Sequence, residues 1–146
     1  KLAFADDYNK MLESPYLRSL LNKGEESIYE LLKNIIYTDF KRYELGVKIR
    51  VADIININKQ RISNEEFSYS LSAHFDFVIF DKSNNTRPIL AIEFDGKYHR
   101  VDKKTIMNDS IKNNLCKIFG FPLERISSED YLSKDLLKNM LAKYCI

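Results

Sequence analysis

The 146-residue chain is poor in the residue types that mark disordered, fibrous or disulfide-bonded proteins. It has four glycines, three prolines, two cysteines and no tryptophan. So little glycine and proline excludes collagen-like and low-complexity chains. The two cysteines, Cys116 and Cys145, are too few for a disulfide scaffold or a zinc site, and they indicate a reducing compartment. The sequence therefore predicts one folded domain in the cytoplasm.

Long hydrophobic runs and a large net charge are also missing. The longest apolar runs are short, such as residues 89–92, so we expect no membrane span. Asp6 and Asp7 come before any apolar core, so we expect no signal peptide. The first residue is not Met, which is compatible with excision from a longer protein that has other domains. The net charge of +2 does not by itself indicate a nucleic-acid partner.

Hydrophobic periodicity predicts the elements of the first half of the chain. The first twenty residues have helical tendency, and Ser14-Pro15 can open a second short helix there. Apolar residues at spacings of 3, 4 and 7 predict an amphipathic helix over residues 24–36. Alternation predicts a strand from residue 43, with an apolar run reaching residue 57. Residues 58–72 are polar, so we expect them to be irregular.

The second half predicts a hairpin followed by a helix, a strand and a last helix. Residues 75–80 and 89–94 are apolar runs separated by a polar turn, which is typical of central strands. A helix over 105–119 ends at Gly120, a strand follows over 121–126, and Ser128 can cap a helix reaching residue 143. We expect an α/β domain with a mixed sheet of about four strands flanked by helices. Its core covers about residues 24–126, with a helical extension at 1–23 and a C-terminal helix at 128–146.

Acidic residues lie at one end of the predicted hairpin. If the turn is centred between Asn84 and Asn85, paired residue numbers sum to 169, and Asp76 faces Glu93 while His74 faces Asp95. Opposed Cβ atoms in such pairs lie roughly 5 Å apart, so the carboxylates would repel one another. A cation or a bound proton relieves this repulsion, and Mg²⁺ or Mn²⁺ suits an all-oxygen cluster. The pattern favours a metal site.

Simpler interpretations of these acids stay open. Asp95 precedes Gly96 and can merely end a strand, while Asp76 and Glu93 can pair with Arg or Lys from a helix. Each acid taken alone favours the simpler interpretation, and the three acids together favour the metal. We interpret His74 as structural.

The residues from Asp76 to His99 resemble the PD-(D/E)XK restriction-endonuclease-like superfamily. Asp76-Phe77 is followed seventeen positions after Asp76 by Glu93-Phe94-Asp95-Gly96-Lys97-Tyr98-His99. The pattern is most similar to a bacterial domain-of-unknown-function branch related to very short patch repair endonucleases. Weaker matches extend the resemblance over about residues 24–126; they are Glu25, Asp109 with Lys112, and Arg125-Ile126. Two residues depart from the superfamily pattern: Phe75 stands in place of proline, and Asp95 stands where many relatives have lysine.

The resemblance implies a restriction-endonuclease-like core and metal-dependent hydrolysis of phosphodiester bonds. It implies Mg²⁺ or Mn²⁺ held by Asp76 and Glu93, with Asp95 as a third ligand or water-orienting base and Glu25 near a second metal or a water. The lysine of the site is Lys97 or Lys112, and both alternatives stay open. His99 is a candidate general acid or phosphate contact.

A basic segment follows the acids. Residues 97–117 contain six bases and two acids, and the candidate DNA contacts are Arg100, Lys103, Lys104 and Lys112. We therefore expect a Mg²⁺-dependent deoxyribonuclease. One alternative is a catalytically inactive module of the same fold that binds nucleic acid or a protein. Another is a metal-free structural domain whose acids all form salt bridges.

Overall fold

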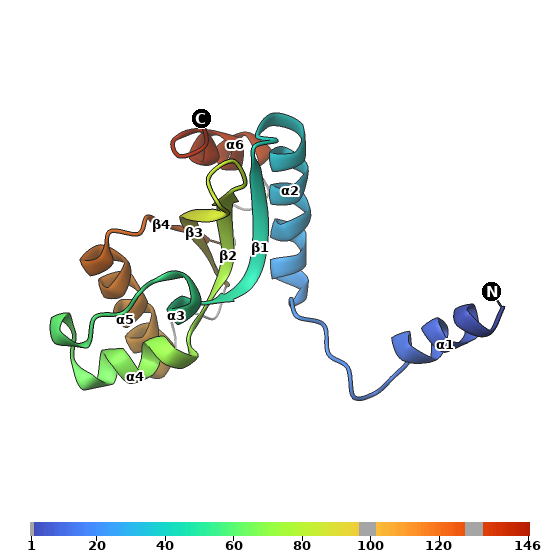
Figure 1. Ribbon diagram of the computed structural model, residues 1–146, viewed down its shortest axis with the longest axis horizontal. Coiled ribbons are helices and arrows are strands. Elements are labelled where there is room, and N and C mark those ends of the chain that lie inside the picture. The colour runs from blue at the N-terminus through green and yellow to red at the C-terminus, as the bar shows by residue number, and fades with distance from the viewer. Residues whose placement is uncertain (1, 97–101, 128–132) are drawn as a thin grey trace.

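A four-stranded mixed sheet forms the centre of the computed structural model, which describes residues 2–96, 102–127 and 133–146 (Figure 1). The strands lie in the order β1-β2-β3-β4. The β1–β2 and β2–β3 pairs are antiparallel, and β4 is parallel to β3. This arrangement confirms the α/β class and the sheet of about four strands. The strands are β1 (Tyr43–Arg50), β2 (His74–Asp81), β3 (Arg87–Asp95) and β4 (Leu123–Ser127).

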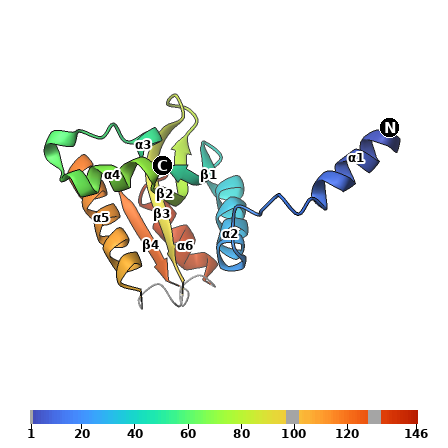
Figure 2. The same cartoon turned by 90° about the horizontal axis from the view of Figure 1, so that it is seen from below.

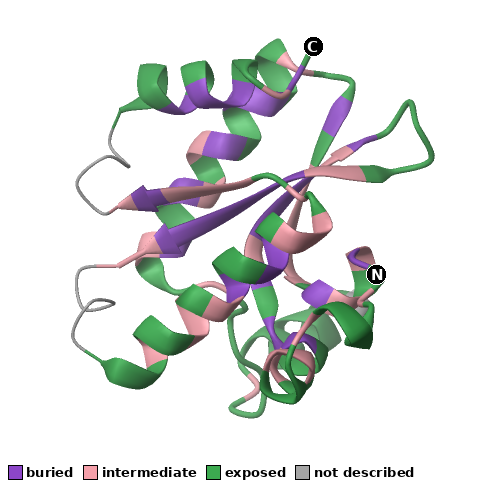
Figure 3. Ribbon diagram, turned by 90° about the vertical axis from the view of Figure 1, so that its left-hand side faces the viewer, coloured by how far each residue is buried: buried purple, intermediate pink, exposed green. Residues whose placement is uncertain are grey.

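Helices cover both faces of the sheet (Figure 2). On one face, α2 (Lys23–Asp39) and α6 (Lys134–Ala142) pack on a core that includes Phe77 and Ile92. A second core on the other face contains Phe75 and Leu115. It is built with α3 (Val51–Ile54), α4 (Asn64–Ser72) and α5 (Lys103–Phe119). The central strands β2 and β3 are largely buried, β1 and β4 are mostly half-buried, and the outer sides of the helices are exposed (Figure 3).

The N-terminal part differs from the prediction. Helix α1 (Leu2–Leu12) lies apart from the sheet and its covering helices (Figure 1). Residues 13–22 contain no helix, so Pro15 does not open one. Tyr16 is 91% exposed and Leu20 is 63% exposed, so no apolar face is buried there to stabilise a short helix. None of the helices in the described ranges is both long and apolar enough to cross a membrane.

The predicted irregular excursion over residues 58–72 is partly helical. A 3₁₀ turn spans Lys59–Arg61, and α4 follows from Asn64. Helix α4 begins with a capping box, in which Ser63 accepts from the Glu66 N–H and the Glu66 carboxylate accepts from the Ser63 N–H. The sequence contains this pattern as Ser-x-x-Glu, but the polar composition of the segment favoured the expectation of an irregular structure.

The hairpin turn is off-centre, and a bulge corrects the register. Next to the turn, Asp81 pairs with Arg87 and Phe80 with Pro88, one residue away from the expected pairing. An irregularity between Ile79 and Phe80 shifts the register by one residue. From Ile79 to Phe77, which pairs with Ile92, the paired residue numbers therefore have the expected sum of 169. The prediction of strand alignment was therefore correct from Ile79 to Phe77, although its assumption about the turn was wrong. The predicted pairs Asp76–Glu93 and His74–Asp95 lie beyond the end of the ladder, where His74 pairs with Arg50 and Asp95 with Ser127.

The C-terminal half follows the prediction closely. Helix α5 ends at Gly120, whose φ of +71° is the left-handed conformation that glycine adopts without strain. Strand β4 begins three residues later. The cap of α6 is Ser133, whose hydroxyl accepts from the Leu136 N–H. The predicted cap, Ser128, lies outside the described residues.

Ser63→Ala tests whether the capping box holds α4. Loss of the hydroxyl leaves the Glu66 N–H without its partner, so we expect the free energy of unfolding to fall by about 1 kcal/mol in urea denaturation. Ser68→Ala is the matched control, because Ser68 is exposed in the interior of the same helix. Equal effects of the two substitutions would contradict the capping role.

Candidate functional site

The central sheet splits at the end where the acids lie. The β2–β3 ladder has its last pair at Phe77–Ile92. Beyond it, β2 stays paired with β1 as far as Arg50–His74, and β3 stays paired with β4 as far as Asp95–Ser127. Two buried strands therefore separate, and the backbone groups facing the gap need other partners.

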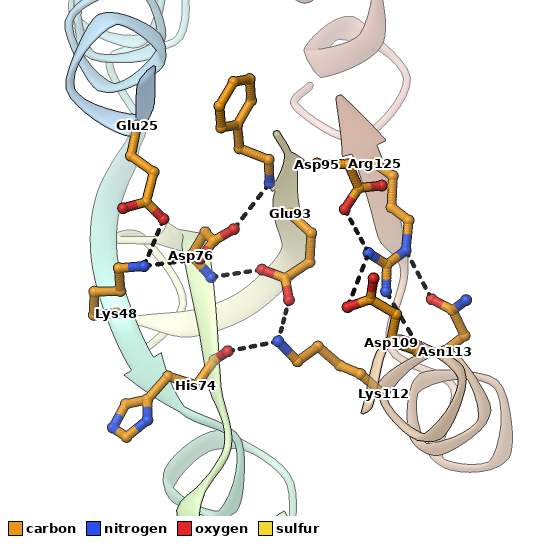
Figure 4. A network of polar contacts seen from close by, with 11 residues as sticks. Glu25, Lys48, His74, Asp76, Glu93, Asp95, Asp109, Lys112, Asn113 and Arg125 are labelled. Carbon is orange, nitrogen blue, oxygen red and sulfur yellow. Dashed lines mark hydrogen bonds and ion pairs between the residues drawn. The ribbon is translucent and has the colours of Figure 1, made fainter. Parts of the chain in front are cut away.

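The side chains of Asp76 and Glu93 bridge this gap (Figure 4). The Asp76 N–H donates to Oε2 of Glu93 at 2.8 Å, and the Phe94 N–H donates to Oδ2 of Asp76 at 2.9 Å. Each carboxylate thus replaces a missing ladder carbonyl on the opposite strand. The two acids lie beside each other because each accepts a hydrogen bond from the backbone of the other acid's strand.

Lys112 of α5 holds Glu93 from the other side. Its ammonium donates to Oε1 of Glu93 and, at 2.8 Å, to the carbonyl of His74. Both side chains are almost fully buried, Glu93 at 5% exposed and Lys112 at 10%. A pair this deep is stable only because each charge has a partner.

Lys48 of β1 connects Asp76 to helix α2. Its ammonium lies 2.6 Å from Oε2 of Glu25 and 2.9 Å from Oδ1 of Asp76. The other oxygen of Glu25 accepts from the Asn22 N–H in the capping box of α2. A Cβ added to Gly24 would lie 2.8 Å from Cε1 of Phe94, so glycine is what lets the first turn of α2 approach β3 this closely.

The backbone of Lys48 is unusual. Its φ is +49°, in the left-handed region that a lysine seldom adopts inside a strand. The β1–β2 pairs on either side, Val47–Phe77 and Ile49–Phe75, are regular. Such a conformation costs of the order of 1 kcal/mol and persists only where surrounding contacts hold it. Here the two carboxylates hold the Lys48 side chain.

Asp95 lies on the other half of the split sheet, beside Arg125 of β4. Nη1 of Arg125 is 2.8 Å from Oδ1 of Asp95 and 3.8 Å from Oδ1 of Asp109. The guanidinium also donates to the Asp109 carbonyl and to the side-chain oxygen of Asn113. This second cluster joins β3, β4 and α5.

Burial and neighbouring charges set the pKa values of the two central acids apart. Burial and the adjacent Asp76 raise the pKa of Glu93 to about 7, although Lys112 works against this. Burial would also raise the pKa of Asp76, but the Phe94 N–H and the Lys48 ammonium together bring it below its usual value. The pKa of Lys48 is raised, because Glu25 and Asp76 outweigh the opposing effect of burial. Near neutral pH, Asp76 is the more firmly ionised carboxylate of the pair.

The remaining predicted site residues fall into two groups. Lys97, His99 and Arg100 lie outside the described residues. Lys103 and Lys104 are exposed in the first turn of α5. His74 is also exposed, and its ring points away from the network (Figure 4).

Two bases that pair with the predicted acids were not predicted as site residues, Lys48 and Arg125. The alternation of apolar and polar residues in 45–51 marks Lys48 as a solvent-facing strand residue, and its positive φ has no sequence signal. Arg125 is visible in the sequence only as part of the Arg-Ile match.

Asp76 and Glu93 suit a metal of the Mg²⁺ type. Such an ion needs only one or two protein carboxylates and takes its other ligands from water and phosphate. All four carboxylate oxygens already accept a protein hydrogen bond, and each oxygen has a second lone pair. Within the described ranges, no group of three or more His, Cys, Asp or Glu side chains is placed to hold a metal. The donor set therefore fits a two-carboxylate site, with Glu25 and Asp95 directed to Lys48 and Arg125.

Substitutions of Lys48 distinguish the effect of its backbone conformation on stability from the effect of its charge. Lys48→Gly and Lys48→Ala both remove the ammonium, but only glycine adopts a φ of +49° without strain. We expect the glycine variant to be more stable than the alanine variant by about 1 kcal/mol in urea denaturation. The opposite order, which is normal inside a strand, would show that the positive φ is not required.

The pKa of Glu93 predicts a pH-dependent stability. Because the folded pKa is raised to about 7, the folded chain retains a proton that the unfolded chain loses, so this stabilising contribution declines as pH rises from about 5 to 7. Relative to Glu93→Gln, the wild-type free energy of unfolding should fall by up to about 1.4 kcal/mol per pH unit there. Parallel curves, measured in urea with EDTA, would contradict the raised pKa.

Comparison with known proteins shows the family of the chain and does not show an activity. No curated protein and no solved structure matches it. Residues 17–144 match a family model described as "Protein of unknown function (DUF2726)". That match covers all six strands and helices that meet at the site, from α2 to β4. The chain belongs to the DUF2726 family.

Proposed function

We propose that this chain is a metal-dependent nuclease that hydrolyses phosphodiester bonds, with DNA as its substrate. The observation that best supports the proposal is the Asp76–Glu93 pair at the split between two central strands. Two carboxylates side by side at the ends of two central strands, one buried and one half-buried, suit a divalent cation.

The placement of the matched residues gives further support. Helix α2, strands β2 and β3, helix α5 and the parallel strand β4 carry the residues on which the resemblance rests, and α3 and α4 lie between β1 and β2. Asp76 lies on β2 and Glu93 on the neighbouring strand β3, so the two acids that the resemblance implies as metal ligands lie next to each other. We therefore propose that the core is restriction-endonuclease-like.

Asp76 and Glu93 would hold Mg²⁺ or Mn²⁺, which when bound supplies positive charge to the phosphate and lowers the pKa of a water. Lys112 orients Glu93, and the Phe94 N–H orients Asp76. The exposed Lys103 and Lys104 at the start of α5 provide positive charge for a polyanion.

One observation favours a second candidate, a catalytically inactive module that binds nucleic acid or a protein. Asp76, Glu93 and Asp95 each form an ion pair with a base of the chain, namely Lys48, Lys112 and Arg125. Charges balanced in this way need no metal for stability. The two candidates differ in whether a divalent cation binds and whether any nucleic acid is cut.

A thermal melt with and without Mg²⁺ or Mn²⁺ tests the metal site. A cation at 100 times its Kd adds about 2.7 kcal/mol to the free energy of unfolding, so the Tm should rise. Asp76→Asn and Glu93→Gln should abolish the rise, and Glu30→Gln, an exposed acid on α2, should keep it. A Tm that no cation changes would favour the fully salt-bridged, metal-free domain.

Cleavage assays decide between the nuclease and the inactive module. Supercoiled, linear and single-stranded DNA and RNA are incubated with Mn²⁺ and either wild-type protein or Glu93→Gln. We expect the wild-type protein to cut DNA and the variant to lose that activity. Binding of metal without cleavage of any substrate would support the inactive module, and equal cleavage by both proteins would exclude Glu93 from the site.

A further inference from the structure

Lys48 combines three features that a purely structural lysine does not need. Its ammonium contacts acids from two different elements, Glu25 at 2.6 Å and Asp76 at 2.9 Å. Its backbone is held in the left-handed region with a φ of +49°. Its side chain is 24% exposed, although both partners lie deeper in the protein. The Lys48 side chain is therefore more accessible to a substrate than either of the acids that it contacts.

Lys112 has a different environment from Lys48, and this difference indicates that the two lysines have different roles. Its ammonium is enclosed by Glu93, the carbonyl of His74 and the ring of Phe75, whose centroid is 5.8 Å away. Movement toward a substrate would leave a buried carboxylate and a buried carbonyl without their donor. Lys112 is thus committed to Glu93.

We propose that Lys48 is the residue whose ammonium contacts the phosphate during cleavage, and that Glu25 is the positioning residue that holds it there. This inference rests on the proposed function. It assigns the role of the site lysine to a residue on β1. Many relatives in the superfamily that the sequence resembles have that lysine two positions after the acid, where this chain has Asp95. A cation drawn to Asp76 would weaken the bond of Lys48 to that acid, while the bond to Glu25 keeps the ammonium in place.

The role requires charge and no proton transfer. In the hydrolysis, a water oxygen bonds to phosphorus as the bond to one ester oxygen breaks with its electron pair. The proton that the water loses is balanced by the proton that the departing oxygen takes from solvent. Lys48 stays protonated throughout and stabilises the negative charge on the phosphate oxygens.

Lys48→Met tests the proposal through two measurements on the full chain. We expect the single-turnover rate of DNA cleavage with Mn²⁺ to fall about 100-fold or more. Mn²⁺ affinity, measured by calorimetry without DNA, should stay equal or become tighter, because a competing cation has left Asp76. Lys48→Arg should restore part of the rate. Lys33→Met, which removes an exposed lysine of α2, should change neither quantity.

Three results for Lys48→Met would overturn the proposal while the proposed function stands. An unchanged rate would mean that Lys48 does not meet the phosphate. A parallel loss of rate and Mn²⁺ affinity would mean that it only maintains the site. A gain in both would mean that it blocks the metal. If wild-type protein cuts nothing, or no better than Glu93→Gln, the proposed function fails and this assignment fails with it.

Glu25→Gln tests the positioning role. The amide oxygen can still accept from the Asn22 N–H, so the α2 cap is kept while the charge facing Lys48 is lost. We expect a lower cleavage rate in the wild-type background and no further decrease in the Lys48→Met background. Additive losses in the double variant would show that Glu25 acts independently of Lys48.

Discussion

The exchange of hydrogen bonds between two acids and the backbone across the split sheet is the constraint on which the site depends. Where β2 and β3 separate, the N–H groups of Asp76 and Phe94 would lack acceptors in the interior. The carboxylates of Glu93 and Asp76 supply them. Because both acids serve the backbone, their distance and orientation follow from the sheet itself. The same bonds bring two negative charges together, and that repulsion accounts for the cations gathered around them.

Three bases form ion pairs with the acids at the split, namely Asp76, Glu93 and Asp95, and each base comes from a different element. Lys48 ties β1 and α2 to Asp76, Lys112 ties α5 to Glu93, and Arg125 ties β4 to Asp95. Buried ion pairs roughly break even in free energy, so stability comes chiefly from the two apolar cores on the faces of the sheet. The ion pairs instead determine which polar groups meet at the split.

Much of the fold could be predicted because it depends on apolar periodicity. The hairpin, α2, α5 and β4 all follow from hydrophobic spacing and one helix-ending glycine. The facing of Asp76 and Glu93 followed from pair counting, and a bulge at Ile79 and Phe80 cancelled an error in the assumed turn. Helix α4 was missed because its buried side is small; Ser70 is its only fully buried residue in the described structure. Lys48 was missed because a positive φ and a partner 23 positions away leave no local pattern.

The split also explains why an acid can stand two residues after Glu93. At Asp95, β3 has left β2 and runs with β4, so this side chain meets Arg125 on the far half of the sheet. A lysine there would place its charge against a guanidinium, and that repulsion would work against the β3–β4 pairing. The half of the sheet that still includes Asp76 carries β1, and Lys48 stands on β1 opposite that acid. Asp76 and Asp95 therefore each receive positive charge from the neighbouring strand of their own half of the sheet, and Glu93 between them receives it from Lys112 of α5.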